Sequence, residues 1–249
     1  MSPFVAGERL IVALDVEGER QALDMVERLE ERIRFFKVGS ELYTACGPRI
    51  VEAIRRRRAK VFLDLKFHDI PTTVARSVAA ASRLGVSIVN VHALGGEEMM
   101  RRAKEALLRE ASKLGVAPPR LIAVTILTSL DANRLKKVGL RDSIDKNVLS
   151  LARLAKRSGA DGVVSSPREL KMLRGQMGED FLIVTPGVRP AWAESHDQKR
   201  TLTPGEAVAR GADYLVVGRP ITGVENPAVA CGRIIDEMAA AAAEAGRRG

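Results

Sequence analysis

Short apolar segments rich in β-branched residues recur along the whole chain and alternate with segments of helical periodicity. The apolar segments predict eight strands, over residues 10–16, 35–39, 60–67, 87–93, 121–127, 162–166, 181–187 and 214–220. Between them, apolar side chains three and four positions apart predict helices over residues 21–33, 48–58, 72–84, 97–114, 146–158, 167–173, 204–211 and 227–245. Strands that alternate with helices in this way predict an α/β fold with a parallel sheet.

The simplest closed form of such a sheet is a single-domain (β/α)₈ TIM barrel over residues 1–249. No linker or shift in composition divides the chain, and 249 residues match the typical length of about 250 for this fold. A doubly wound open sheet is the alternative. Charged residues favour the barrel, because they end apolar strands where such barrels place their active sites: Asp15, Lys37, Asp64 and Lys66.

Residues 61–74 join a predicted strand, a charged loop and the start of a helix. A regular strand directs Asp64 and Lys66 to one face, because they are two positions apart. Asp69 follows in the loop, and Pro71 fits the first turn of a helix. A structural ion pair would also explain this spacing. Charges embedded in three successive apolar strands favour an active site instead.

Two glycine- and arginine-containing segments follow the seventh and eighth predicted strands, Thr185-Pro-Gly-Val-Arg189 and Val217-Gly-Arg-Pro-Ile221. Barrel enzymes commonly bind phosphate with these two loops. Glycine lets backbone N–H groups approach the phosphate oxygens, and arginine can bind them with two hydrogen bonds. Each segment alone could be a tight turn with a surface charge. The long polar loop that follows Arg189 contains Gln198 and is either a lid or a tolerated insertion.

Composition narrows the class of protein. The net charge of +9 predicts affinity for anions such as phosphorylated metabolites, nucleic acid or anionic lipid. Aromatic residues make up only 4% and are not interleaved with basic stretches, which argues against single-stranded nucleic acid as a partner. Neither a membrane-spanning run nor a signal peptide is predicted. Cys46 and Cys231 show no paired spacing and indicate reduced thiols in a cytoplasmic protein.

Several cofactor classes have no motif in this chain. There is no His-x-His, Glu-x-x-His or Cys-x-x-Cys spacing, so no metal is expected. No G-x-G-x-x-G follows a predicted strand, so no dinucleotide cofactor is expected. The pairs Thr128-Ser129 and Ser165-Ser166 lack a neighbouring histidine base, which argues against a serine nucleophile.

Taken together, these motifs resemble the orotidine 5′-monophosphate decarboxylase family. The segment Asp64-Leu-Lys66-Phe-His-Asp69-Ile-Pro is similar to the family signature. The other family motifs occur in the same order: Ala13-Leu-Asp15, Phe36-Lys37-Val-Gly, Leu127-Thr-Ser and the two segments after the last two strands. The resemblance implies a homodimeric (β/α)₈ barrel with shared active sites. It also implies conversion of orotidine 5′-monophosphate to uridine 5′-monophosphate, in pyrimidine synthesis, without cofactor or metal.

The resemblance also implies roles for individual residues. The catalytic tetrad would be Lys37, Asp64, Lys66 and Asp69, with Lys66 protonating C6 of the pyrimidine. Asp69 would come from the neighbouring subunit, with Ile70 and Thr73 beside it. The remaining substrate contacts would be Asp15 to the ribose, Thr128 or Ser129 to the pyrimidine, Gln198, Gly218 and Arg219 to the phosphate, and Arg189 at the base of the lid.

Two other functions remain open at this point. A sibling barrel acting on a sugar phosphate would share the Asp-x-Lys-x-x-Asp core but use magnesium, although Ile70-Pro71 resembles the orotidylate enzyme. A basic barrel without catalysis would bind nucleic acid through the arginines at 55–58, with strong salt dependence.

Overall fold

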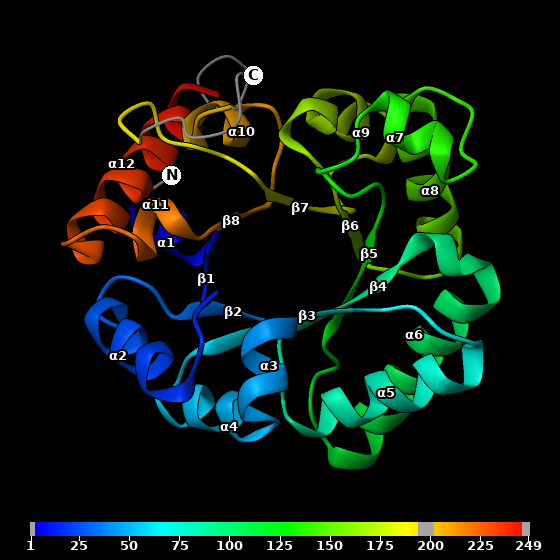
Figure 1. Cartoon of the computed structure of the whole chain (residues 1–249), viewed down its shortest axis with the longest axis horizontal. Helices are drawn as coiled ribbons and strands as arrows, with labels where there is room; N and C mark the ends of the chain where they lie inside the picture. Colours follow the sequence, from blue (N-terminus) through cyan, green and yellow to red (C-terminus); the bar gives the residue numbers. More distant parts are fainter. Residues whose placement is uncertain (1–2, 194–201, 246–249) are drawn as a thin grey trace. The chain divides into compact units, whose positions relative to one another are not determined.

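The computed structural model describes residues 3–193 and 202–245, and it has eight parallel strands in the order of a closed barrel (Figure 1). The strands are β1 (Leu10–Ala13), β2 (Phe35–Gly39), β3 (Lys60–Phe67), β4 (Ile88–His92), β5 (Arg120–Val124), β6 (Gly162–Val164), β7 (Leu182–Pro186) and β8 (Tyr214–Val217). Each corresponds to one predicted strand, so the predicted (β/α)₈ fold is confirmed.

Helices follow the strands as the periodicity predicted. The main α-helices are α2 (Glu19–Leu29), α4 (Arg49–Arg56), α5 (Pro71–Arg83), α6 (Gly96–Leu114), α8 (Ile144–Arg157), α9 (Leu170–Met177), α10 (Pro204–Ala209) and α12 (Pro227–Ala245). The helix predicted to begin at Pro167 starts as a 3₁₀ turn, η2 (Pro167–Glu169), and continues as α9.

Five shorter helical elements were not predicted from the periodicity. They are α1 (Pro3–Glu8), α3 (Ser40–Cys46), α7 (Ala132–Lys137), α11 (Arg219–Thr222) and η1 (Ala93–Gly95). Two or fewer turns carry too few apolar positions to show a period.

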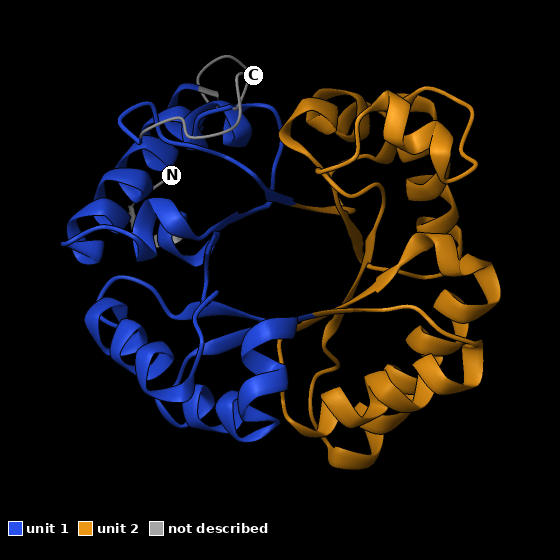
Figure 2. Cartoon of the chain, viewed as in Figure 1, with its two compact units in different colours: residues 1–64, 185–249 blue, residues 65–184 orange. Residues whose placement is uncertain are grey.

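Contacts divide the chain into two compact units (Figure 2). Unit 1 comprises residues 1–64 and 185–249, and unit 2 comprises residues 65–184. In unit 1, β1 pairs with β2 and β8, and β2 pairs with β3. In unit 2, β4, β5, β6 and β7 pair in that order. That residues 1–249 form one domain stays a prediction.

Unit 1 packs its helices around strands that are buried on both faces. Every residue of β1 and β2 is buried, as expected for parallel strands covered on both sides. Helix α12 contacts α1 and α10 (Figure 1), and Ile234 and Met238 on it have no exposed surface. The strands and the helix packed around them therefore form the apolar core of unit 1.

The first strand ends earlier than predicted. Its last residue is Ala13, where the sequence predicted an end at residue 16. The backbone N–H of Leu14 still donates to the carbonyl of Lys37 at 3.0 Å. Asp15 follows outside the strand and is exposed, so the prediction that it lies within the end of the first strand was wrong. Because Asp15 lies in a loop, the alternation of side chains between the two faces of a strand does not set the direction of its carboxylate.

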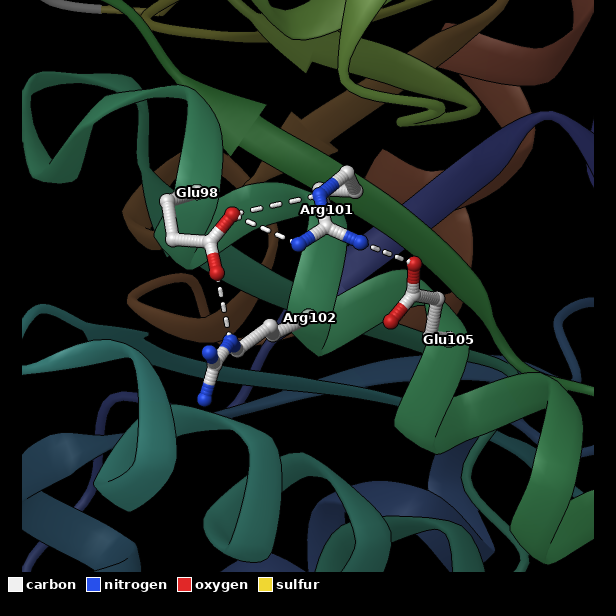
Figure 3. Close-up of polar contacts among 4 residues, drawn as sticks. All are labelled: Glu98, Arg101, Arg102 and Glu105. Carbon is white, nitrogen blue, oxygen red and sulfur yellow. Dashed lines mark hydrogen bonds and ion pairs between the residues drawn. The ribbon is translucent and has the colours of Figure 1, made fainter.

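Helix α6 in unit 2 carries a network of exposed ion pairs (Figure 3). Glu98 Oε2 lies 2.6 Å from Arg101 Nη2, its Oε1 lies 2.6 Å from Arg102 Nε, and Arg101 also pairs with Glu105. Hydrogen bonds from Arg101 and then Arg102 lower the pKa of Glu98. Exposed pairs of this kind are screened by salt, and we interpret the network as a solvated helix face.

Both cysteines, Cys46 and Cys231, are free and buried. Burial raises the pKa of the Cys231 thiol to about 12, so it stays protonated at neutral pH. Within residues 3–193 and 202–245, no helix has the length and apolar composition that crossing a bilayer requires.

One buried carboxyl group in unit 2 yields a prediction about stability. Glu169 is buried, its Oε2 accepts a hydrogen bond from Ser165 Oγ at 3.2 Å, and burial raises its pKa. A carboxyl whose pKa is raised on folding stabilises the fold while protonated, and that contribution is lost as pH rises through the folded-state pKa. We therefore expect Glu169→Gln to raise the thermal midpoint at pH 7 by about 2–4 °C, measured by calorimetry.

The pH dependence separates this cause from a change in packing. The difference between the Glu169→Gln variant and the parent should vanish below about pH 4, where both the folded and the unfolded carboxyl become protonated. Glu179 provides the control, because its side chain is 88% exposed. Glu179→Gln should give no pH-dependent gain. A thermal midpoint of the Glu169→Gln variant at or below that of the parent at pH 7 would contradict the prediction.

Candidate active site

Three charged side chains meet in unit 1, two from neighbouring strands and one from the loop after β1. Lys37 lies on β2, Asp64 on β3, and Asp15 in the loop after β1. Lys37 Nζ donates a hydrogen bond to Asp15 Oδ1 at 2.9 Å and lies 3.3 Å from Asp64 Oδ2. The structure thus places one ammonium group between two carboxylates that are far apart in the sequence.

Burial and charge act against each other at Lys37. Lys37 and Asp64 are each only 8% exposed, whereas the Asp15 side chain is 58% exposed. Burial alone would lower the pKa of Lys37, but the attraction of Asp64 and then Asp15 outweighs it, and the pKa is raised. Lys37 is therefore an ammonium ion at neutral pH, and it holds the Asp64 carboxylate in place.

Gly39 was not among the predicted site residues, yet it makes room for this cluster. A Cβ atom at Gly39 would lie 2.9 Å from Lys37 Nζ and 3.4 Å from Asp15 Oδ1. Any side chain there would displace the ammonium group. The available signal was a glycine two residues after Lys37 on the same strand, where a side chain points to the same face.

The remaining described candidates in unit 1 come from the segments after β7 and β8. Gly218 precedes α11, and its Cα faces Asp15: a Cβ there would lie 3.6 Å from Asp15 Oδ2. Arg219 is the first residue of α11 and is exposed. Arg189 is half-buried, and its backbone N–H donates to Leu202 O at 3.0 Å.

Lys66 has an unusual backbone conformation. It belongs to β3, yet its φ is +50°, in the left-handed region that residues with a side chain rarely adopt. The strand predicted over residues 60–67 is therefore confirmed, but its extended backbone is interrupted at Lys66. Its N–H donates to the side-chain Oδ1 of Asn90 on β4 at 2.8 Å. Asn90, like Gly39, was not predicted as a site residue.

Three further candidates are exposed in the loop after β3 and in the first turn of α5. Asp69 Oδ1 accepts a hydrogen bond from the Ile70 N–H at 2.6 Å. Ile70 is 66% exposed and directly precedes Pro71, the first residue of α5. Thr73 is also exposed, and its N–H donates to Ile70 O at 3.1 Å. An apolar side chain this exposed at the start of a helix is available for contact with another molecule.

Thr128 and Ser129 lie between β5 and α7, and both are exposed. The Ser129 carbonyl accepts a hydrogen bond from Arg134 Nη1 at 3.0 Å, and Asp131 caps α7 by accepting from the Arg134 N–H. The cap orders the helix end of this loop.

The predicted site residues that the structure describes therefore divide between the two units. Unit 1 holds the Asp15–Lys37–Asp64 cluster with Arg189, Gly218 and Arg219, and unit 2 holds Lys66, Asp69, Ile70, Thr73, Thr128 and Ser129. Gln198 lies outside the described residues. In the described ranges, no three His, Cys, Asp or Glu residues are grouped as ligands for a metal ion.

Comparison with known proteins gives a consistent result over most of the chain. The model of the family described as "Orotidine 5'-phosphate decarboxylase / HUMPS family" matches residues 8–234. The orotidine 5'-phosphate decarboxylase of Syntrophotalea carbinolica is 52% identical over 239 residues, which cover 96% of this chain and 98% of that protein. The enzyme of the same name from Geobacter sulfurreducens is 51% identical over 235 residues, which cover 94% and 98%.

A solved structure agrees with these sequences. The crystal structure of orotidine 5'-phosphate decarboxylase from Lactobacillus acidophilus superimposes with a TM-score of 0.83 at 40% sequence identity. The match covers 93% of this chain and 99% of that one.

Proposed function

The chain belongs to the orotidine 5'-phosphate decarboxylase / HUMPS family, and from this premise we propose that it converts orotidine 5′-monophosphate to uridine 5′-monophosphate. The observation that carries the proposal is the 52% identity to a protein of that name over 96% of this chain. The residues of the tetrad motif support it, since Lys37, Asp64, Lys66 and Asp69 stand in the family's order. Uridine 5′-monophosphate would be the product of the last step of de novo pyrimidine synthesis.

The reaction sets a specific electrostatic problem. The bond between C6 of the pyrimidine and its carboxylate breaks, carbon dioxide leaves, and the electron pair stays on C6. No conjugated group beside C6 can accept that pair. The enzyme must therefore stabilise the carbanion by charge and then protonate it.

Lys66 is the proposed source of that charge and of the proton. In the sequence it stands between Asp64 and Asp69, the two carboxylates of the proposed tetrad. The ammonium N–H would donate its proton to C6, and the neutral amine would then take a proton from water. Asp64 would lie near the departing carboxylate and disfavour the ground state.

The cluster in unit 1 supports the proposed role of Asp64. Because Lys37 Nζ is only 3.3 Å from Asp64 Oδ2, this ion pair fixes the position of the carboxylate. Asp15, which Lys37 also contacts, is the proposed ligand of the ribose hydroxyl groups. The Lys37 ammonium group would thus orient both Asp64 and the carboxylate that binds the ribose.

The remaining proposed contacts bind the two ends of the nucleotide. Arg219, the Gly218 backbone and Gln198 would bind the phosphate, and Arg189 would lie at the base of a lid. Thr128 or Ser129 would contact the pyrimidine. Binding energy from the phosphate would be realised mainly in the transition state, since a single lysine cannot supply an acceleration of ~8–23 kcal/mol.

We also infer a homodimer with shared active sites. The exposed Ile70, next to Asp69 and near Thr73, supports this inference because it offers an apolar contact for a second copy. Asp69 would then complete the site of the neighbouring subunit. The proposal includes no metal, no organic cofactor and no nucleic acid, and it places the enzyme in the cytoplasm, where the free Cys46 and Cys231 would stay reduced.

A spectrophotometric assay with orotidine 5′-monophosphate tests the proposed function. We expect loss of the substrate's absorbance with formation of uridine 5′-monophosphate, at the same rate with and without a chelator. Activity that needs added magnesium, on a sugar phosphate and not on orotidylate, would instead identify the sibling activity in this family. The absence of turnover on either substrate would sink the proposal.

A further inference from the structure

The strained backbone of Lys66 points to a residue that acts through it. We propose that Asn90 is a positioning residue for Lys66: its side-chain carbonyl holds the Lys66 backbone in the left-handed conformation and so sets where the ammonium group lies. The inference rests on the proposed function only for the statement that Lys66 is catalytic. The backbone part of it stands on the geometry of unit 2 alone.

The conformation of Lys66 needs a cause. A φ of +50° brings Cβ close to the backbone, and for a residue other than glycine it is normally disfavoured. Lysine has no short polar side chain that could compensate locally, as asparagine or aspartate has. The residue also lies within a strand, where extended backbone is the norm. A surrounding contact must therefore hold it, and strain of this kind is typical of functional sites.

Asn90 provides that contact. Its Oδ1 accepts the Lys66 N–H at 2.8 Å, a normal length for an amide hydrogen bond. Asn90 has no exposed surface, and it lies in the middle of β4 between Val89 and Val91. A buried amide is costly unless it is hydrogen-bonded. The hydrogen bond from the Lys66 N–H offsets part of this cost for Asn90.

The consequence concerns the position of the Lys66 side chain. The direction of the Cα–Cβ bond depends on φ, and the ammonium lies at the end of a four-carbon stem. A return of φ to the extended region would therefore move the ammonium group relative to the strand. A misplacement of about 1 Å can cost on the order of 10²-fold in rate. Asn90 would thus affect the rate without contact with the substrate.

Kinetics of two substitutions test the functional half of the proposal. Asn90→Leu keeps a similar volume but removes the acceptor, and Asn90→Asp keeps an oxygen at the same place. We expect the Leu variant to lower kcat by about 10²-fold with KM changed by less than about threefold. The Asp variant should recover at least about tenfold of that loss. Equal losses in both variants, or an unchanged kcat in the Leu variant, would overturn the proposal.

Thermal unfolding tests the conformational half, and it requires no activity. Lys66→Gly and Lys66→Ala both remove the side chain, but only glycine accepts a positive φ without strain. With Asn90 present, the Lys66→Gly protein should therefore melt about 2–4 °C higher than the Lys66→Ala protein. With Asn90→Leu, the backbone can relax to an extended conformation, and the order should reverse because glycine is then the less favourable residue. The same order in both backgrounds would overturn the proposal.

These two measurements separate the proposal from the function it builds on. If the parent protein does not turn over orotidylate, the proposed function fails, but the comparison of glycine with alanine at position 66 still decides the conformational part. Ser158→Ala is the control, because it also removes a buried side-chain hydrogen bond to backbone in unit 2, from Ser158 Oγ to Leu154 O at 2.8 Å. It should leave kcat unchanged. If the Leu variant does not fold, Asn90→Ala carries the same expectations.

Discussion

Replacing Lys66 by alanine should abolish decarboxylation almost completely, with a loss in kcat/KM of about 10⁴-fold or more. The estimate combines the 10²–10⁴-fold effect of a positioned general acid with the effect of a fixed charge at a developing carbanion. The rate of uridine 5′-monophosphate formation, measured with purified protein at several substrate concentrations, checks the result. Turnover within about tenfold of the parent would falsify the role of Lys66 as proton donor.

Two further variants sharpen this test. Lys60 is the matched control, because it lies at the start of the same strand and is exposed, so Lys60→Ala should keep parent kinetics. Lys66→Arg keeps a positive charge, but a guanidinium hardly gives up its proton at neutral pH. The Arg variant should therefore lie between the Ala variant and the parent. Equal activity of the Arg variant and the parent would show that Lys66 acts by charge alone.

The second large effect is expected for Asp64→Asn. The change keeps the shape of the side chain but removes the negative charge that faces Lys37 at 3.3 Å. We expect kcat/KM to fall by about 10²–10³-fold, because a charge placed for the transition state is lost. Steady-state kinetics measure this loss. An unchanged kcat/KM would exclude a catalytic role for the Asp64 carboxylate.

Stability should change in the same variant, for a related reason. Lys37 and Asp64 are both buried, so removing one charge leaves the other with less compensation. Asp15 still accepts a hydrogen bond from Lys37, which limits the expected loss to about 1–3 kcal/mol of unfolding free energy. Asp15→Asn is the comparison: its side chain is 58% exposed, so urea unfolding should show a smaller loss. A larger loss for Asp15→Asn would contradict the buried-pair explanation.

Much of the fold could be predicted from the sequence because the local apolar pattern of most segments agrees with the strand or helix that they form. The strands of unit 1 form continuous apolar segments, and the long helices show a clear apolar period, as in α8. Errors occurred where an element was short or its end was set by a partner strand. Helix α3 has only seven residues, and β1 ends where its pairing with β2 ends. Neither feature leaves a periodic pattern.

The candidate site divides in the same way. Charged residues embedded in apolar strands marked Lys37, Asp64 and Lys66 as candidates, since such positions are costly without a function or a partner. The 2.9 Å hydrogen bond between Lys37 and Asp15 spans 22 positions, and no local pattern contains it. The supporting residues Gly39 and Asn90 carry no charge, so the pattern of charges in apolar strands did not mark them.

By itself, the amino-acid sequence determined the alternation of strands and helices and the residues that carry charge into it, because burial and periodicity act over a few neighbouring positions. Only the tertiary structure decided that Lys37 lies between two carboxylates and that Lys66 has a left-handed backbone. Both features depend on contacts between separate strands: Lys66 is held by Asn90, 24 positions away. A long-range contact of this kind imposes a conformation that the residue's own preferences disfavour.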